Sequence, residues 1–122
     1  MNKNRKIVIG SGLSGPLLAI LLAQRGYFVD LYEKRCDLRN NSISAGRSIN
    51  LALSHRGIKA LKSAKIFDKI EPKLIPMKGR MLHLLNGKTE YQPYSIYSNE
   101  YINSVSRLEL NKILLDKAEK SK

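Results

Sequence analysis

The stretch KIVIGSGLSG, residues 6–15, decides the fold of this chain. Its first four residues predict a short apolar strand, and Gly10, Gly12 and Gly15 follow with the spacing G-x-G-x-x-G. The apolar run LLAILLAQRG predicts a helix that ends at Gly26, and FVDLYE predicts a second strand that ends in Glu33. A strand, a glycine turn, a helix, a strand and an acidic residue in this order are typical of dinucleotide-binding βαβ units. We therefore predict such a unit over residues 6–33.

The glycine turn is suited to hold a diphosphate, because the first turn of a helix has unpaired N–H groups and the positive end of the helix dipole. Gly10 permits the tight turn, Gly12 lets phosphates approach the main chain, and Gly15 lets the helix pack against the strand. Glu33 would accept hydrogen bonds from ribose hydroxyls, and its charge disfavours a 2′-phosphate. These residues predict FAD or NAD, rather than NADP, in this turn. The alternative is a glycine-rich turn without a ligand beside a surface glutamate.

Length and composition limit the class of protein. The chain has 122 residues, of which 43% are hydrophobic, and its one cysteine, Cys36, excludes an internal disulfide and a cysteine-based metal cluster. We expect one domain at most, over residues 1–122. A complete dinucleotide-binding fold has about six strands in two halves, so we expect the N-terminal part of a larger domain. No signal peptide or membrane-spanning stretch is evident, and we expect a soluble, cytoplasmic protein.

The chain is strongly basic, with a formal net charge of +12. Such a charge is found in proteins that bind nucleic acid or anionic membranes. The lysines are scattered, however, and no stacking aromatic residues or nucleic-acid motif accompany them. Acidic regions elsewhere in a larger protein would balance part of the excess. We expect no nucleic-acid partner, and the sequence leaves the oligomeric state open.

The middle of the chain predicts short elements. Residues 34–46 are polar and indicate a loop over the cofactor site, and residues 49–53 predict a strand. Ser54 is a candidate cap for the following helix. Residues 66–70 predict a second short helix that stops before Pro72.

The last third predicts a hairpin, a strand and a helix. Two strand-like runs between residues 77 and 94 flank Asn86-Gly87, a signal for a type I′ turn. Residues 101–105 predict a strand. Ser106 and Glu109 then form an S-x-x-E capping box. The helix beyond places four apolar residues on one face, namely Leu110, Ile113, Leu114 and Ala118.

The segment GRSINLALSHRGIKALK, residues 46–62, carries a specific resemblance to a known family. Together with IPMKGRM (75–81), the region of Tyr94 and YINSVSRLELNKILL (101–115), it resembles the N-terminal part of the kynurenine 3-monooxygenases. The resemblance implies an incomplete, Rossmann-like α/β fold of the aromatic flavoprotein hydroxylase type. It implies FAD as cofactor, NADPH as co-substrate, and hydroxylation of L-kynurenine with O₂ to 3-hydroxykynurenine. Family members continue for several hundred residues, so we expect the chain alone not to catalyse this reaction.

The resemblance also implies roles for residues at matched positions. Gly10, Gly12, Ser14 and Gly15 would line the FAD pyrophosphate. The adenosine ribose would be surrounded by Tyr32, Glu33, Lys34 and Arg35. Ala52 would lie beside the flavin, and Arg107 would contact FAD. Arg80 would hold the kynurenine carboxylate together with Tyr94, because a guanidinium fork suits a carboxylate.

Other interpretations stay open at this point. Arg80 and Arg107 are also compatible with surface arginines, and Cys36 lies in a predicted loop. His55 and His83 lack the spacing of a metal site or a Ser-His-acid arrangement, so we interpret both as structural. No catalytic side chain is expected, because the cofactor carries the chemistry of this family. The alternatives are a related flavin-dependent aromatic hydroxylase with another substrate, and a non-catalytic basic binding module.

Overall fold

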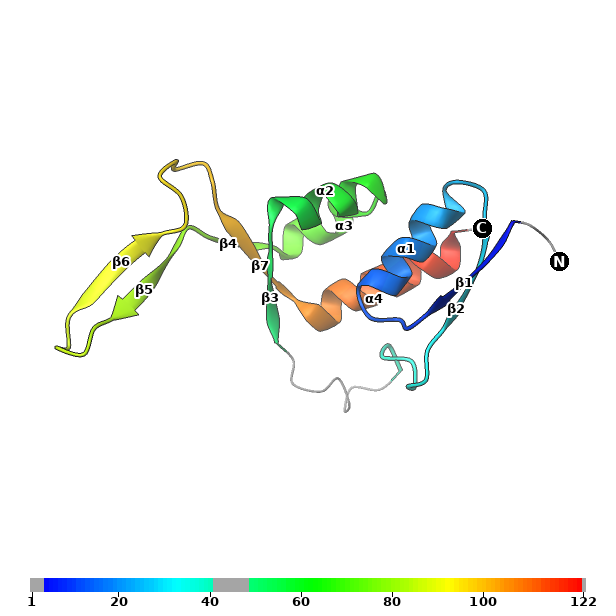
Figure 1. Cartoon of the computed structure of the whole chain (residues 1–122), viewed down its shortest axis with the longest axis horizontal. Coiled ribbons are helices and arrows are strands. Elements are labelled where there is room, and N and C mark those ends of the chain that lie inside the picture. Colours follow the sequence, from blue (N-terminus) through cyan, green and yellow to red (C-terminus); the bar gives the residue numbers. More distant parts are fainter. Residues whose placement is uncertain (1–3, 41–48, 122) are drawn as a thin grey trace.

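A computed structural model describes residues 4–40 and 49–121 of the chain. Its strands and helices make an α/β structure with three small sheets (Figure 1). Their order is β1 (Arg5–Ile9), α1 (Ser14–Ala23), β2 (Phe28–Tyr32), β3 (Asn50–Leu53), α2 (His55–Ser63), α3 (Phe67–Ile70), the 3₁₀ helix η1 (Glu71–Lys73), β4 (Ile75–Met77), β5 (Gly79–His83), β6 (Thr89–Pro93), β7 (Ile102–Ser106) and α4 (Arg107–Lys120).

The N-terminal β1–α1–β2 segment is a parallel βαβ unit. β1 and β2 pair in parallel, with Val8 opposite Leu31 and Ile9 opposite Tyr32. The N–H of Gly10 donates to the Tyr32 carbonyl at 2.7 Å, so the two strands stay paired up to the glycine turn. β2 ends at Tyr32, one residue earlier than the sequence suggested, and Glu33 follows directly after the strand.

The β1–β2 pair has one covered and one open face. Val8, on the face toward α1, is buried. Four large side chains on the opposite face are 57–86% exposed, namely Ile7, Ile9, Phe28 and Tyr32. Parallel sheets are normally covered on both faces. Within residues 4–40 and 49–121, no layer covers this second face.

The hydrophobic core lies between α1, α2, α3, β7 and α4. Its fully buried members include Ile20 of α1, Ile70 of α3 and Leu114 of α4, each at most 1% exposed. The predicted apolar face of the last helix is confirmed: Leu110 and Leu114 are buried, and the other two predicted members pack against them. In Figure 1, α1 and α4 lie side by side, and the glycine turn leads into the start of α1. The core therefore positions this turn against α4.

The second sheet is antiparallel, with the order β3–β7–β4, and it connects the core to the hairpin β5–β6. The hairpin extends away from the rest of the chain (Figure 1). The prediction of a type I′ turn is wrong, because this turn needs a positive φ at Asn86, whereas only Gly87 has one, at 81°. The N–H of Gly87 donates to Leu84, which makes a longer loop with glycine in the left-handed position.

The predicted helix ends are partly right. Ser54 occupies the N-cap position of α2, but its side chain makes no capping hydrogen bond. Ser106 Oγ accepts from the Glu109 N–H at 3.4 Å, which is half of the predicted capping box. The Glu109 carboxylate binds Lys73 instead, so the reciprocal half is absent from the part of the chain described here. α3 ends at Ile70, before Pro72, as predicted, and the 3₁₀ helix η1, which contains Pro72, follows it directly.

Residues 34–40 form no helix or strand, as predicted, and residues 41–48 lie outside the described part of the chain. Arg39 ties this loop to the C-terminal half of α4. Its guanidinium donates to Asp37, to Asp116 at 2.9 Å and to Glu119 at 2.6 Å. Arg39 thereby connects the loop after β2 with the last helix.

We expect an Arg39→Gln variant to lose about 1 kcal/mol of stability near neutral pH, because partly exposed ion pairs contribute modestly. Hydrogen bonds from Arg39 lower the pKa of Asp37 from 3.8 to about 2, and they also lower the pKa of Glu119. A lowered folded-state pKa stabilises the fold fully above the unfolded value and loses this effect as the pH falls through the folded value. The stability difference between variant and wild type should therefore shrink between about pH 4 and pH 2.

Urea unfolding at about pH 6 and about pH 2.5 measures this difference. The control is Arg56→Gln, which removes an exposed arginine of α2. A difference for Arg39→Gln that is the same at both pH values would contradict the expectation.

Candidate functional site

The glycine turn joins β1 to α1 with the geometry that a dinucleotide needs. Gly10 has a φ of 98°, a conformation that L side chains rarely adopt. A Cβ atom on Gly15 would overlap the Gly10 carbonyl oxygen, so α1 packs directly against the turn. A Cβ atom on Gly12 would meet no atom within 4 Å. The backbone is therefore open to a ligand at Gly12 and tightly packed at Gly15.

The N-terminus of α1 presents unpaired backbone donors to this open side. Leu13 is the N-cap residue, and no side chain caps the helix. The first turn contains no acidic residue. Ser14 is the first helical residue and is exposed. Free N–H groups and the helix dipole make this end attractive to an anion.

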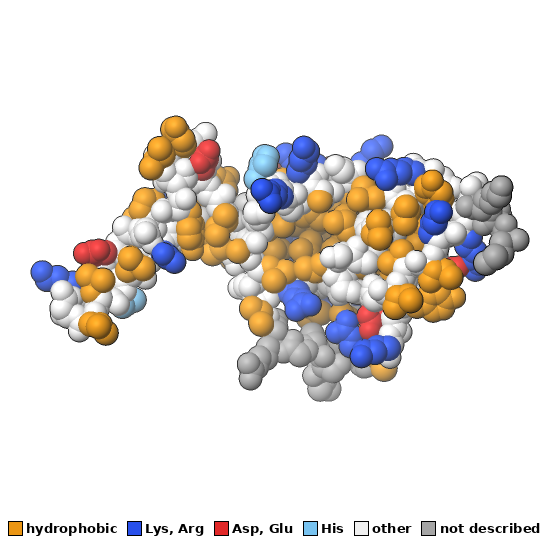
Figure 2. All heavy atoms as spheres, in the orientation of Figure 1, with side chains coloured by type: hydrophobic (Ala, Val, Ile, Leu, Met, Phe, Trp, Pro, Cys, Tyr) orange, Lys and Arg blue, Asp and Glu red, His pale blue; other side chains and the backbone are white. Residues whose placement is uncertain are grey.

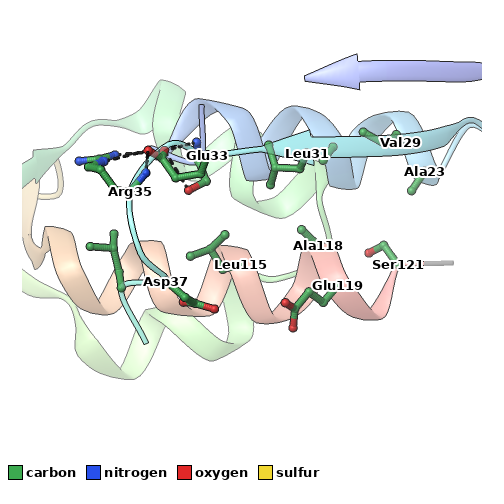
Figure 3. A pocket seen from close by; sticks show the side chains of 13 residues that line it. Ala23, Val29, Leu31, Glu33, Arg35, Asp37, Leu115, Ala118, Glu119 and Ser121 are labelled. Carbon is green, nitrogen blue, oxygen red and sulfur yellow. Dashed lines mark hydrogen bonds and ion pairs between the residues drawn. The ribbon is translucent and has the colours of Figure 1, made fainter. Parts of the chain in front are cut away.

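Glu33 lies beside the turn and is already hydrogen-bonded. Its Oε2 accepts from the N–H of Ser11 at 2.8 Å and from Ser11 Oγ at 3.1 Å. Its Oε1 accepts from the backbone N–H of Arg35 at 3.0 Å and from Arg35 Nε at 2.9 Å (Figure 3). The Arg35 guanidinium, and next the Ser11 N–H, hold the pKa of Glu33 well below its usual range. The carboxylate is therefore charged at physiological pH and can accept hydrogen bonds from hydroxyl groups.

The predicted ribose residues gather at the ends of the parallel strands. A hollow of about 620 Å³ is lined by Ile9, Gly10, Tyr32, Glu33, Lys34 and Arg35. The structure thus brings the four predicted ribose residues together with Gly10. That they bind a ribose stays a prediction.

A second cavity of about 420 Å³ lies between β2 and α4. Val29 and Leu31 of β2 point toward Leu115 and Ala118 of α4 across this cavity (Figure 3). Its middle is therefore apolar, while acidic side chains also line it, namely Glu33, Asp37 and Glu119.

The structure adds Ser11 and Asn111, which sequence reasoning missed. Asn111 of α4 is buried, and its Nδ2 donates to the Ser11 carbonyl at 3.2 Å. Its Oδ1 is buried without a partner among the described residues. The sequence does hold a sign of this role, because Asn111 is a polar residue between Leu110 and Leu114 on the predicted apolar side of the helix. Arg107 is exposed at the start of α4, one helical turn before Asn111 and on the same helix face.

The predicted flavin and substrate residues lie elsewhere. Ala52 is exposed in β3, opposite Ser104 of β7. Arg80 of β5 donates from Nε to Gln92 Oε1 at 2.7 Å. The N–H of Tyr94 donates to the Lys78 carbonyl, which places Tyr94 at the same end of the hairpin as Arg80. In Figure 1 the hairpin extends away from the glycine turn, so the described residues do not form one continuous site.

The remaining candidate residues offer no further chemistry. His55 and His83 are exposed, and so is the free thiol of Cys36. Within the described ranges, no group of three His, Cys, Asp or Glu residues could hold a metal ion. Lys and Arg side chains lie in separate groups on the face shown in Figure 2 rather than in one continuous patch.

The geometry of the glycine turn suits a dinucleotide such as FAD. The open space at Gly12, the uncapped N-terminus of α1 and the charged carboxylate of Glu33 fit a diphosphate followed by a ribose. The buried Oδ1 of Asn111, which has no partner among residues 4–40 and 49–121, lies on a residue that contacts the same turn. These features define a dinucleotide-binding βαβ unit.

The comparisons with known proteins agree with this class. The model of the NAD(P)-binding Rossmann-like domain family matches residues 8–69, just over half of the chain, and the chain belongs to this family. It is homologous to the N-terminal quarter of the kynurenine 3-monooxygenases.

Two of these relatives illustrate the similarity. The chain is 49% identical to kynurenine 3-monooxygenase of Legionella pneumophila (strain Corby) over 112 residues, 92% of this chain and 25% of the relative. It is 51% identical to that of Sus scrofa over 113 residues, 93% of this chain and 24% of the relative. The chain therefore spans about a quarter of the length of the curated relatives that it matches.

Solved structures show the same fold at lower identity. 2-Methyl-3-hydroxypyridine-5-carboxylic acid oxygenase matches with a TM-score of 0.76 and 22% identity, over 99% of this chain and 30% of that one. p-Nitrophenol 4-monooxygenase PnpA from Pseudomonas putida DLL-E4 matches with a TM-score of 0.70 and 17% identity, over 93% of this chain and 29% of that one. The predicted fold class, an incomplete Rossmann-like α/β fold, is thus confirmed. Among the described helices, none is long and apolar enough to cross a membrane.

Proposed function

We propose that this chain forms the diphosphate and ribose side of the FAD site in an NADPH-dependent kynurenine 3-monooxygenase. The observation that carries the proposal is the identity of 49–51% to such enzymes across more than nine-tenths of the chain. The open backbone at Gly12 and the charged Glu33 support FAD as the ligand. The basic binding module is less well supported, because the cationic side chains on the face shown in Figure 2 lie apart and no comparable similarity to a binding module accompanies them.

Each part of the chain would have a separate task in that enzyme. The bound flavin would supply the redox and oxygen chemistry. The N–H groups at the start of α1 would bind the diphosphate, and Glu33 would exchange its contacts with Arg35 for ribose hydroxyls. Arg80, with Tyr94, would orient the substrate through its carboxylate. The remaining three quarters of the enzyme would complete the site.

A chimaera tests this function. It joins this chain to the part of the Legionella relative that lies beyond the matched quarter, and it is referred to below as the chimaera. We expect purified chimaera to bind FAD and to oxidise NADPH faster when L-kynurenine is added, with 3-hydroxykynurenine as the product. The whole Legionella relative is the positive control, and product analysis with 4-hydroxybenzoate distinguishes a different aromatic hydroxylase. A folded chimaera that gains no flavin would contradict the proposal.

A further inference from the structure

α4 carries a polar side chain into the buried layer beneath the glycine turn. Asn111 is only 5% exposed, and its helix neighbours Leu110 and Leu114 are buried as well. Burying an amide costs free energy unless its polar atoms find partners. A leucine at this position would continue the apolar face of α4, so the asparagine has a role beyond packing.

The amide of Asn111 is oriented by a single long-range contact. Its Nδ2 donates to the Ser11 carbonyl at 3.2 Å across 100 positions of sequence. Only the nitrogen of the amide can donate to a carbonyl. The Oδ1 is consequently left buried without a partner in the described part of the chain. The amide of Asn111 therefore binds the Ser11 carbonyl in an orientation in which its own Oδ1 has no partner among the described residues.

This contact determines the orientation of the next peptide unit. The Ser11 carbonyl and the Gly12 N–H belong to one planar trans peptide, in which they point in opposite directions. Because Asn111 holds the carbonyl toward α4, the Gly12 N–H points away from α4. Ser11 is also held by Glu33, through its N–H and Oγ. A Cβ atom at Gly12 would meet no atom within 4 Å, so there is open space at this residue.

We propose that Asn111 is a positioning residue for the diphosphate of the bound dinucleotide, an inference that rests on the proposed FAD site. Its hydrogen bond to Ser11 holds the Gly12 N–H in the orientation that a phosphate oxygen requires. Arg107 lies one helical turn earlier on the same face of α4. α4 therefore sets the geometry of an anion site whose donors come from the glycine turn and α1.

The first test uses the 122-residue chain without a ligand. Asn111→Asp keeps the size of the side chain and replaces the donor by an acceptor. The matched control is Asn103→Asp, since Asn103 is a buried asparagine of β7, 6% exposed, in another sheet. The residual dipolar coupling of the Gly12 N–H, measured by NMR, reports the orientation of the peptide whose carbonyl Asn111 binds, so it should change in Asn111→Asp and stay the same in the control. An unchanged Gly12 coupling in folded Asn111→Asp would overturn the inference.

The second test measures FAD affinity in the chimaera. Asn111→Asp should bind FAD about 10- to 100-fold more weakly, and Asn103→Asp should stay within about 3-fold of the unsubstituted protein. Aspartate also adds a negative charge near the diphosphate, so the neutral Asn111→Leu is measured as well. It removes the donor, keeps an apolar helix face and should show the same loss, and an unchanged affinity in folded Asn111→Leu would overturn the inference. Equal losses of affinity in both positions would overturn the inference. A folded, unsubstituted chimaera without flavin contradicts the proposed function instead, and the Gly12 coupling of the 122-residue chain still decides the role of Asn111.

Discussion

Replacing Gly15 with alanine is expected to destabilise this chain by about 3 kcal/mol, whereas the same change at Gly12 is expected to leave its stability within about 0.5 kcal/mol. The alanine methyl group at Gly15 would overlap the Gly10 carbonyl oxygen, which is backbone and cannot rotate away. α1 would have to move off the turn, and its contacts with the sheet would weaken. At Gly12 the methyl group meets no protein atom within 4 Å, and the backbone there is not in the left-handed region.

The Gly12 variant should differ from the wild type in its affinity for FAD rather than in its stability. A methyl group added at Gly12 would stand where the diphosphate approaches the main chain, so Gly12→Ala should lower the FAD affinity of the chimaera about 10-fold or more. Urea unfolding followed by circular dichroism measures the stability, and flavin fluorescence measures the affinity. A stable Gly15→Ala variant would contradict the packing argument. A Gly12→Ala variant with unchanged affinity would contradict the placement of the diphosphate.

The glycine turn was predictable because its demands are local. A positive φ at Gly10 and a close backbone contact at Gly15 each select glycine at a fixed position, so the spacing alone carries the information. The apolar face of α4 was predictable for a similar reason, since the helical repeat places Leu110 and Leu114 on the same side.

Contacts between distant residues could not be read in the same way. Arg39 meets Asp116 and Glu119 across 77 and 80 positions, and Asn111 meets Ser11 across 100. Such pairs depend on how α4 packs beside the turn, and no local pattern encodes them. The dipeptide Asn86-Gly87 shows that a local pattern can predict a turn without predicting the type of turn. It marks a turn, but the φ at Asn86, which sets the type of turn, is determined by the loop as a whole.

The predicted substrate residue Arg80 leads to the second large expected effect. In the chimaera, Arg80→Met should raise the KM for L-kynurenine about 10- to 100-fold, because a charge-assisted hydrogen bond to a carboxylate contributes about 1.5–3 kcal/mol. The Nε of Arg80 donates to Gln92, and the two Nη atoms have no hydrogen-bond partner within the described residues. They are therefore available to a carboxylate, and the bond to Gln92 holds the guanidinium in one orientation.

The affinity for FAD should stay unchanged in Arg80→Met, because the hairpin lies far from the glycine turn in Figure 1. Lys88→Met, between β5 and β6 at the tip of the same hairpin, removes an equal charge and is the matched control. Steady-state kinetics and flavin titration measure the two quantities separately. Equal effects of Arg80→Met and Lys88→Met on KM would reduce the role of Arg80 to general electrostatic attraction. A KM that rises only for Arg80→Met, with FAD retained, would mean that the hairpin binds the substrate while the glycine turn binds the cofactor. The flavin ring would then have to extend from the glycine turn toward the hairpin to reach the substrate.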